Sequence, residues 1–488
     1  MRLMFVLLCA LVAAAPEVSA QITDAEFRQR RDSLTARLPQ DAVIIAFGER
    51  DEIGFPAFYQ SPNFRYLTGL SEPNAVLVIT GRDASSRSVG TLFRQDRAPS
   101  DVLFNGPLEE PAQLTRRTNL AVRPLAQLSV VVDSLIAAGR PLYMVRDTRP
   151  YGGTNDTLTR GTLFAAALRR RAPAPTIRSA DTVILALRGR KSDAEEQLVR
   201  RSTAITSQSV NNAIRNIHAG LHEYDVQAMI EAGFRSSGGD SHPGFATNVS
   251  AGMNSTTAHH RADDAPLEAG KLVLMDVGAA YQGYSADVTR TVPVSGKFTP
   301  EQRDIYQLVR DAQASAERAA TLDAPGNGMS DSASATIARG LTRLGLIESP
   351  DATFDPPWAD RCARNPGQCR QSYFFYFHGV GHGIGLDVHD ATQHSAGRGG
   401  AAGEGIKPGD AFTIEPGIYI DARRIALLSD TPKNRAFIAK MRSVLAKYDG
   451  IGVRIEDDYM ATPRGVERIT SAVREISEIE ALMQPPRP

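Results

Sequence analysis

Two apolar segments that the sequence predicts to form a β-hairpin each carry one aspartate, Asp276 in the first and Asp287 in the second. If the hairpin is symmetric about Tyr281 and Gln282, the two carboxylates lie directly opposite each other, about 5 Å apart on one face. Like charges at that distance are destabilising, and a bound cation would remove the repulsion. A shifted register that leaves one aspartate in the turn or on the surface explains these residues equally well.

Three of the nine histidines of the chain, His378, His382 and His389, fall within twelve residues. His378 and His382 have the spacing of neighbours on a helix face. However, every second residue from 379 to 385 is glycine, and each would cost a helix about 1 kcal/mol. We therefore predict an extended or looped segment. This concentration of imidazoles indicates a site more strongly than a solvated surface.

Two glutamates lie in later strand-like segments, Glu415 within Phe412–Tyr419 and Glu456 within Gly452–Asp458. An acid in such an apolar run is costly to bury unless it is paired or bound to a metal. Arg454, two residues before Glu456, lies on the same strand face and is a candidate partner. For either glutamate alone, an acid on an edge strand is the simpler interpretation.

Taken together, these acids and one histidine have the composition of a metal site. Four carboxylates carry a charge that two divalent cations would balance. Oxygen ligands with a single imidazole favour Mn, Co, Fe or Zn. Two such ions about 3.5 to 4 Å apart hold a bridging hydroxide and polarise a carbonyl, which is the equipment of metal-assisted hydrolysis.

The elements that must position these side chains follow from local sequence patterns. Ser192 and Thr299 are predicted to cap helices, because a glutamate or glutamine stands three residues after each. The apolar pattern of this half of the chain predicts helices over residues 192–217 and 223–235, a third helix from 299, and strands over 271–278 and 284–294.

The first half of the chain alternates helical and strand-like stretches, which predicts an α/β domain. Its glycines form no phosphate-binding pattern. Near residue 188 the chain becomes basic and polar, so we expect an N-terminal domain over 21–188 and a catalytic domain over 189–482. The predicted helices span 25–37 and 158–171, and the predicted strands span 42–47, 75–80, 141–145 and 182–186.

Residues 1–20 have the pattern of a secretory signal peptide, with an apolar run over 3–15 followed by small residues at 18–20. The run is shorter than the roughly 18 residues that a membrane-spanning helix needs. No later stretch is long and apolar enough to span a bilayer. We therefore expect an exported protein, periplasmic or secreted, with no membrane association after the signal peptide is removed.

Removal of this leader would leave Cys362 and Cys369 as the cysteines of the mature chain. In an oxidising compartment such a pair is expected to form a disulfide. Two free thiols are the alternative, and two isolated thiolates lack the spacing of a zinc site.

The overall charge excludes one class of partner. Lysines and arginines number 55, as do aspartates and glutamates, while 42% of the residues are hydrophobic. This is the composition of a globular protein without a basic field that would gather nucleic acid. Specificity must therefore lie in a local site.

Four sequence blocks that carry these acids and histidines resemble those of the pita-bread metallopeptidases, in the branch that contains aminopeptidase P and prolidase. In addition, residues 60–74 resemble the N-terminal domain of aminopeptidase P. The resemblance implies an α/β N-terminal domain followed by an α+β pita-bread catalytic domain. The four blocks are MDVGAAYQGYSADVTRT, HGVGHGIGLDVHD, TIEPGIY and GVRIEDDYM.

The resemblance also implies roles for individual residues. Glu415 would serve both as a ligand and as the general base and acid. His378 and His389 would hold the substrate, Arg454 would support the ligands, and His259 matches an upstream site histidine better than His260 does. The ligands of two divalent ions, with Mn expected and Co, Zn or Fe as alternatives, would be Asp276, Asp287, His382, Glu415 and Glu456.

The expected function is a dinuclear-metal exopeptidase that hydrolyses the Xaa-Pro bond at the N-terminus of proline-containing peptides. A prolidase, which accepts only dipeptides, and a metal-free pita-bread binding module are the alternatives. We also expect a homodimer or larger homo-oligomer. Two segments, 351–372 and 421–451, are long for the simplest members of the family and leave the length of the substrate and the direction of cleavage open.

Overall fold

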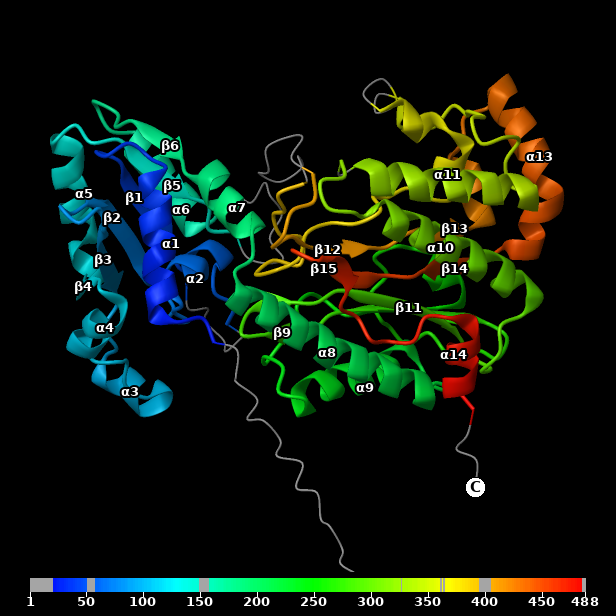
Figure 1. The fold of residues 1–488 in the computed structure, drawn as a ribbon, viewed down its shortest axis with the longest axis horizontal. Coiled ribbons are helices and arrows are strands. Elements are labelled where there is room, and N and C mark those ends of the chain that lie inside the picture. The colour runs from blue at the N-terminus through cyan, green and yellow to red at the C-terminus, as the bar shows by residue number, and fades with distance from the viewer. Residues whose placement is uncertain are drawn as a thin grey trace, which may run out of the picture.

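The computed structural model describes residues 21–50, 58–148, 158–325, 327–359, 362, 365–394 and 405–484. The predicted signal peptide lies outside these residues. Figure 1 shows two lobes, which are joined where α7 (Asp181–Gly189) is followed by α8 (Asp193–Asn216). No helix in the described part of the chain is long and apolar enough to cross a membrane.

The N-terminal lobe contains one six-stranded mixed sheet with the order β4-β3-β2-β1-β5-β6. Its strands are β1 (Val43–Phe47), β2 (Val76–Arg82), β3 (Ser88–Arg94), β4 (Ala121–Pro124), β5 (Leu142–Val145) and β6 (Ile177–Ser179). The central strand β1 pairs antiparallel with β2 and parallel with β5. Its five residues are all buried because helices cover both faces of the sheet.

The helices of this lobe are α1 (Asp24–Ala36), α2 (Pro62–Thr68), α3 (Pro99–Asn105), α4 (Pro111–Thr118), α5 (Leu128–Ala137), α6 (Arg160–Arg169) and α7. Alternate residues of β1 face opposite sides, as expected for a strand. Ile44 belongs to the same buried cluster as Leu34 of α1, and Ile45 belongs to the cluster that contains Val132 of α5. The α/β fold class predicted for this half is confirmed.

The predicted strand over 182–186 is wrong, because these residues belong to α7. A short apolar run does not distinguish a strand from a buried helix by periodicity alone. In the structure, Ile184 and Arg188 are one helical turn apart and both are buried. Asp181, the first residue of the helix, accepts a hydrogen bond from the backbone N–H of Arg146 at 2.9 Å.

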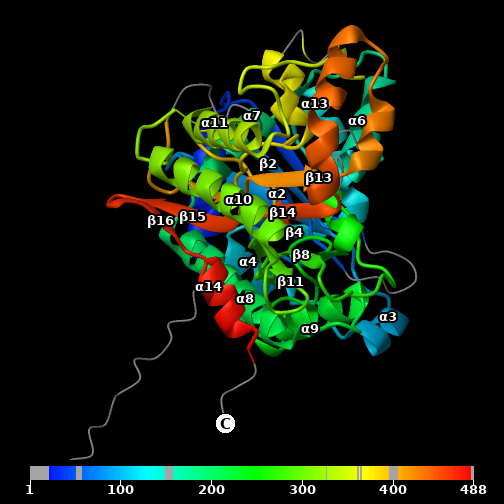
Figure 2. The ribbon, with the colours of Figure 1, turned by 90° about the vertical axis from the view of Figure 1, so that its right-hand side faces the viewer.

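The catalytic lobe contains small antiparallel sheets between two pairs of helices. Figures 1 and 2 show α8 and α9 (Glu223–Ser236) on one side of the strands, and α10 (Pro300–Ala319) and α11 (Asn327–Leu344) on the other. The strands are β7 (Asn248–Ala251), β8 (Leu272–Val277), β9 (Ala280–Tyr281), β10 (Tyr284–Ser285), β11 (Val288–Pro293), β12 (Ala411–Ile414), β13 (Gly417–Ile420), β14 (Ile451–Arg454), β15 (Asp457–Thr462) and β16 (Gly465–Arg468).

The helix starts predicted in this half are confirmed. The Ser192 hydroxyl accepts a hydrogen bond from Glu195 N at 3.2 Å, and the Glu195 carboxylate accepts one from Ser192 N at 2.9 Å. Thr299 and Gln302 form the same reciprocal cap at the start of α10. Each cap satisfies backbone donors that a helix leaves unpaired at its first turn.

The hairpin that carries the two aspartates pairs in a register two residues away from the predicted one. Its turn is Gln282-Gly283, and both residues have positive φ values, 49° and 81°. Such two-residue turns match the twist of the flanking strands. Asp276 therefore pairs with Thr289 instead of Asp287. Because side chains alternate with a period of two, this shift keeps both aspartates on one face as diagonal neighbours.

The two long segments noted in the sequence pack against each other. Phe354 of the first contacts Phe437 of α13 (Pro432–Tyr448), with ring centroids 5.7 Å apart. The first segment also contains the disulfide between Cys362 and Cys369, as predicted. Short 3-10 helices lie in or beside these segments at 366–369, 371–374 and 422–427. The last helix in the described part of the chain is α14 (Ile476–Leu482).

Candidate metal centre

Glu415 and Glu456 both occupy breaks between two strands. Glu415 lies between β12 and β13, and Glu456 lies between β14 and β15. The backbone N–H of Glu415 donates to Val380 O at 2.6 Å, and that of Glu456 donates to Thr289 O at 3.1 Å. These bonds hold one glutamate beside the histidine segment and the other beside β11, the strand that follows Asp287.

The glycine-rich histidine segment is irregular, as predicted, and it packs against β12. The carbonyl of His382 accepts a hydrogen bond from Thr413 N at 2.8 Å. A Cβ atom on Gly381 would lie 2.0 Å from Thr413 O, and one on Gly383 would lie 2.5 Å from Asp390 O. The glycines therefore permit a close approach of backbones that a side chain would prevent.

His382 presents one ring nitrogen to three carboxylates. Its Nδ1 lies 3.0 Å from Gly383 O, and because a carbonyl only accepts, Nδ1 carries the proton of a neutral ring. The lone pair of Nε2 then faces Asp287 Oδ2 at 3.4 Å, Glu415 Oε1 at 3.6 Å and Glu456 Oε1 at 3.8 Å. A backbone carbonyl that fixes the tautomer in this way is the usual partner of a metal-binding imidazole.

Asp287 and Glu456 are buried, Glu415 is partly buried, and the three carboxylate charges repel one another. Burial, together with the charge of Glu456, raises the pKa values of Asp287 and Glu415 well above their usual range. Burial, followed by the charge of Asp276, raises the pKa of Glu456 to about 7. A cluster of this kind is stable in its ionised form only with compensating positive charge.

The donor set fits divalent cations. Asp287 Oδ1 and Glu456 Oε1 are buried and have no hydrogen-bond partner among the described residues, although most buried polar atoms are bonded. One ligand atom from each of Asp287, His382 and Glu456 lies within 4.8 Å of the others. Carboxylate oxygens with one imidazole suit Mn, Fe, Co or Zn.

Arg454 pairs with Asp276 and not, as the sequence suggested, with Glu456. Its Nη2 donates to the Asp276 carboxylate, its Nη1 donates to the hydroxyl of Tyr419 at 2.8 Å, and its Nε donates to Thr289 Oγ1 at 3.1 Å. Strand β14 ends at Arg454, so the alternation that would place residues 454 and 456 on one face does not reach Glu456.

His378 uses both ring nitrogens within the protein. Its Nδ1 donates to Gly379 O at 2.7 Å, and its Nε2 accepts from the Tyr419 hydroxyl at 2.8 Å. Burial and the charge of Arg454 lower the pKa of His378 to about 3, so the ring is neutral. Tyr419, which links Arg454 to His378, was missed in the sequence, where its only signal is its place in the TIEPGIY block.

The two adjacent histidines upstream of β8 have different environments. His260 Nε2 lies 2.8 Å from Glu223 Oε2, a fully buried carboxylate at the start of α9. His259 instead lines the cleft that contains the acids. His389 lines the same cleft, with its ring centroid 4.1 Å from that of His382.

One cleft of about 900 Å³ brings the predicted site together, and both domains form its walls. The N-terminal domain contributes Arg146, Thr148 and Leu185. These three residues were also missed, because a wall supplied by another domain leaves no local motif. The predicted site residues that line the cleft are His259, Asp276, Asp287, His378, His382, His389, Glu415, Arg454 and Glu456.

Comparison with known proteins finds relatives along nearly the whole chain. Residues 27–143 match the aminopeptidase P N-terminal domain, and residues 197–463 match metallopeptidase family M24. A Xaa-Pro aminopeptidase of Haemophilus influenzae is 29% identical over 480 residues, which cover 95% of this chain and 98% of that protein.

Two solved structures show the same architecture. Aminopeptidase PepP of Pseudomonas aeruginosa has a TM-score of 0.76 and 30% identity, and the match covers 95% of this chain and 98% of that one. Aminopeptidase P of Escherichia coli with the inhibitor Pro-Leu has a TM-score of 0.75 and 26% identity, with the same coverage.

These likenesses confirm the predicted fold, an α/β N-terminal domain followed by an α+β pita-bread catalytic domain. The match to residues 197–463 spans more than half of the chain and includes every predicted acid and histidine of the site. Divalent cations are therefore part of the chemistry of this enzyme, and the chain belongs to metallopeptidase family M24.

Proposed function

We propose that this protein is an aminopeptidase that removes the first residue of peptides whose second residue is proline. The observation that carries the proposal is the cluster of Asp287, Glu415 and Glu456 around His382 Nε2, inside a cleft that both domains wall. Relatives named Xaa-Pro aminopeptidase or aminopeptidase P match this two-domain chain over nearly its full length.

A dedicated enzyme for this bond has a chemical reason. The nitrogen of an Xaa-Pro bond carries no hydrogen, so peptidases that bind a substrate through that N–H group lose a contact. A cleft that recognises proline by its shape, and the free N-terminus by its charge, does not need that donor. The acidic centre supplies the negative charge that an N-terminal ammonium would meet.

We propose that two divalent cations, Mn in preference to Co, Zn or Fe, are held by five side chains. When bound, such ions supply an activated water and polarise the scissile carbonyl. Arg454 holds Asp276 in place through its Nη2, and Thr289 donates its hydroxyl to Glu456 Oε2 at 2.7 Å. The five proposed ligands are Asp276, Asp287, His382, Glu415 and Glu456.

Glu415 is the proposed general base and acid. It would take a proton from the attacking water and then give that proton to the nitrogen of the departing proline. Water oxygen becomes bonded to the carbonyl carbon, and the C–N bond breaks as the nitrogen receives the proton. His378 Nδ1 lies 3.8 Å from Glu415 Oε2 and borders this carboxylate.

Two further histidines, His389 and His259, are assigned to the substrate. His389 lies beside His382 at the cleft wall and is placed to donate to the oxygen that becomes negative during hydrolysis. His259 borders the same cleft from the loop before β8. Since both nitrogens of His378 are bonded within the protein, we assign that ring to the shape of the cleft and to the Tyr419–Arg454 contact.

We also propose that the chain is exported and that it forms a homo-oligomer. The pattern of residues 1–20 supports export, as does the Cys362–Cys369 disulfide, because disulfides persist in oxidising compartments. Protein recovered outside the cytoplasm should begin near Gln21, and an intact N-terminus retained inside the cell would contradict export. Light scattering of that material should give a multiple of the chain mass.

Activity on three matched substrates tests the proposed function. A tripeptide with proline second should lose its first residue in the presence of Mn²⁺, and chelation should stop the reaction. The same tripeptide with alanine as its second residue should be cleaved at least about tenfold more slowly. Equal rates for the two tripeptides would indicate a general exopeptidase. Cleavage of an Xaa-Pro dipeptide alone would identify a prolidase, and release from the carboxyl end would contradict the proposed direction.

A further inference from the structure

Arg188 joins the N-terminal domain to the histidine segment of the catalytic domain. It lies near the end of α7 and is 2% exposed. Its Nη1 donates to Asn63 Oδ1 of α2 at 2.7 Å, and its Nη2 lies 2.7 Å from Asp387 Oδ2 and 2.7 Å from Asp390 Oδ1. One guanidinium therefore contacts the two carboxylates that flank His389 in the chain.

Lys191 strengthens the same contact from the domain boundary. Its Nζ donates to Arg188 O at 2.9 Å and to Ala391 O at 3.1 Å, and it lies 3.4 Å from Asp390 Oδ2. Lys191 and Asp390 are both almost fully buried. The positive charges of Arg188 and Lys191 thus balance the negative charges of Asp387 and Asp390, and this cluster needs no bound metal ion.

The chain is closely packed at this junction. A Cβ atom on Gly385 would lie 2.1 Å from Asp390 Oδ2, and one on Gly189 would lie 3.2 Å from the carbonyl carbon of Thr392. Ala391 N donates to Asp390 Oδ1 at 2.8 Å. The segment that contains His389 is therefore held by the end of α7 and by contacts within residues 385–392.

We propose that Arg188 is a positioning residue that fixes His389 against His382 in the cleft. Arg188 does not line the cleft, whereas Asp387, His389 and Asp390 do, so its effect on the reaction passes through this segment. The inference rests on the proposed function, because His389 is assigned there to the substrate oxygen. It gives the N-terminal domain a part in turnover as well as in the cleft wall.

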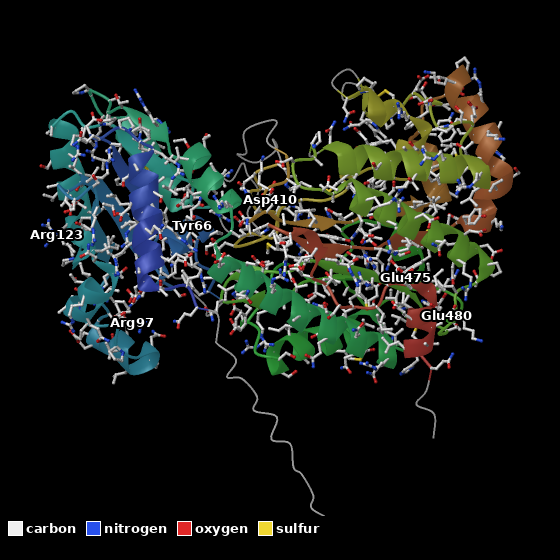
Figure 3. The ribbon with its side chains drawn as sticks, in the orientation of Figure 1. Tyr66, Arg97, Arg123, Asp410, Glu475 and Glu480 are labelled. Carbon is white, nitrogen blue, oxygen red and sulfur yellow. A yellow bond between two sulfur atoms is a disulfide. The ribbon has the colours of Figure 1, made fainter. Side chains whose placement is uncertain are left out.

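The geometry requires an arginine. The planar guanidinium reaches Asn63 with one nitrogen and both carboxylates with another, whereas a lysine offers a single compact charge at the end of a flexible stem. Figure 3 shows Tyr66, also on α2, on the side of the N-terminal lobe that faces the catalytic domain. The Arg188 side chain is thus buried at the interface between the domains, while Asp387 reaches the cleft with a side chain that is 26% exposed.

A double-mutant cycle between Arg188 and His389 tests the proposal. Arg188→Met and Arg188→Lys should each lower kcat by about 10- to 100-fold, the size found when groups that orient active-site residues are removed. The metal content and KM should stay close to the wild-type values. In a His389→Ala background, Arg188→Met should lower kcat by less than about twofold, because a residue that acts through His389 has nothing left to position.

The proposal would be overturned if Arg188→Met lowered kcat by the same factor in the wild-type and His389→Ala backgrounds. A wild-type kcat for Arg188→Lys would also overturn it. Arg31→Met is the matched control. Arg31 is 1% exposed, lies wholly within the N-terminal domain, and donates to the carbonyls of Leu67 and Thr118. This variant should lose stability but keep the wild-type kcat.

Hydrogen exchange gives a readout that does not depend on activity. In Arg188→Met, peptides that cover residues 383–394 should exchange faster than in the wild type, while those that cover β12 and β13 should not change. Arg31→Met should leave both regions unchanged, and unchanged exchange of 383–394 in Arg188→Met would contradict the proposal. If Arg188→Met does not fold, Asp387→Asn should show the same local change.

A wild-type protein without activity on Xaa-Pro peptides would contradict the proposed function, and the exchange result would still decide the positioning role.

Discussion

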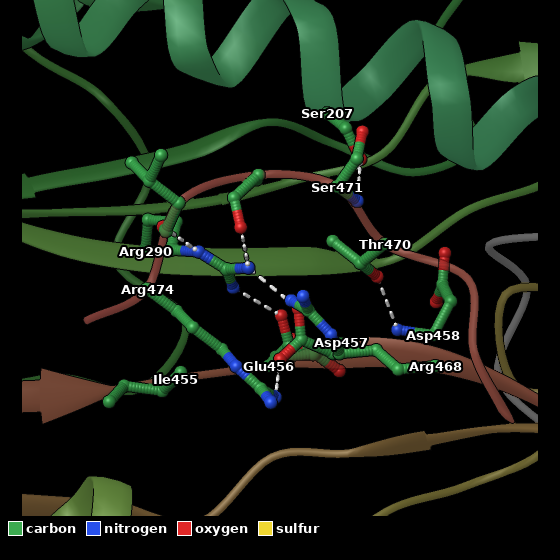
Figure 4. A network of polar contacts seen from close by, with 12 residues as sticks. Ser207, Arg290, Ile455, Glu456, Asp457, Asp458, Arg468, Thr470, Ser471 and Arg474 are labelled. Atoms are coloured by element: carbon green, nitrogen blue, oxygen red, sulfur yellow. Dashed lines mark hydrogen bonds and ion pairs between the residues drawn. The ribbon is translucent and has the colours of Figure 1, made fainter. Parts of the chain in front are cut away.

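Glu456 and Asp457 are consecutive residues, both almost fully buried, and their surroundings are opposite. Glu456 faces three other acids, and burial with the charge of Asp276 raises its pKa to about 7. Burial alone would raise the pKa of Asp457 too, but the charges of Arg290 and Arg474 more than offset it and lower that pKa to about 2. Figure 4 shows Arg290, Arg468 and Arg474 gathered around Asp457.

The difference separates a structural acid from a functional one. Asp457 Oδ1 lies 2.6 Å from Arg290 Nη2, and Asp457 Oδ2 lies 2.8 Å from Arg474 Nη1. Its charge is therefore met entirely by the protein. Glu456 Oε1 instead has no hydrogen-bond partner among the described residues. Burial is similar for both, and the counter-charge differs: arginines outweigh burial at Asp457, whereas the charge of Arg454 does not outweigh burial and the neighbouring acids at Glu456. This insufficient counter-charge marks the candidate cation site.

The largest expected effect is the loss of a ligand in the unbalanced cluster. Glu415→Ala should lower kcat/KM by at least about 1,000-fold, since it removes both a ligand and the proposed base. Metal analysis of the purified variant should show a reduced metal content. Full metal content with full activity would remove Glu415 from the centre.

Histidine variants should divide ligand from substrate contact. His382→Ala should lose metal, because it removes the proposed ligand atom Nε2, which faces the three carboxylates. His389→Ala should keep its metal and lower kcat by about 100-fold, if it stabilises the developing oxyanion. Metal content is measured for both, together with His378→Ala. The assignment is wrong if the His389 variant is empty and the His382 variant is not.

Loss of the charge of Asp457, which its arginines balance, should change the stability of the protein instead of its metal content. Asp457→Asn leaves the buried Arg290 without its ion-pair partner and should cost about 3 to 5 kcal/mol in the free energy of unfolding. Metal bound per folded chain should not change. Denaturant unfolding and metal analysis on one preparation check both statements, and a variant that is stable but empty of metal would break the distinction between the neighbours.

A smaller effect is expected in the pH dependence of the metal-free protein. The folded-state pKa of Glu456, about 7, exceeds its ordinary value of 4.5. The folded state therefore holds its proton to higher pH than the unfolded state does, and stability falls as pH rises from about 4.5 to 7. Thermal unfolding in chelator should show this fall, and added Mn²⁺ should reduce it. A metal-free protein that becomes more stable over this range would show that the acids are compensated.

Local signals in the sequence predicted the elements better than they predicted the contacts between them. The caps at Ser192 and Thr299 depend on residues three positions apart, so the sequence contains all that is needed. The short apolar run over 182–186 predicts a strand, whereas the burial of Ile184 and Arg188, one helical turn apart, favours the helix that the structure contains.

The same division applies to the site. Asp276, Glu415 and Glu456 interrupt apolar runs and His378 and His382 lie in a glycine-rich run, which are local signals, whereas His259 is identified only through the family resemblance. The register of the Asp276–Asp287 hairpin was wrong by two residues, yet a shift of two leaves both aspartates on one face. Arg188 and Tyr419 act through partners far away in the chain, and no local pattern in the sequence announces such contacts.

Metal binding to the chelated wild-type protein tests the central claim most directly. Titration with Mn²⁺, followed by calorimetry and by the metal content after dialysis, should give two ions per chain and a higher unfolding temperature. Glu456→Gln should reduce the stoichiometry, while Asp457→Asn should retain it in the folded fraction. If the wild-type protein binds no divalent cation and its unfolding temperature does not change, the unbalanced carboxylates are not a metal centre and the account is contradicted.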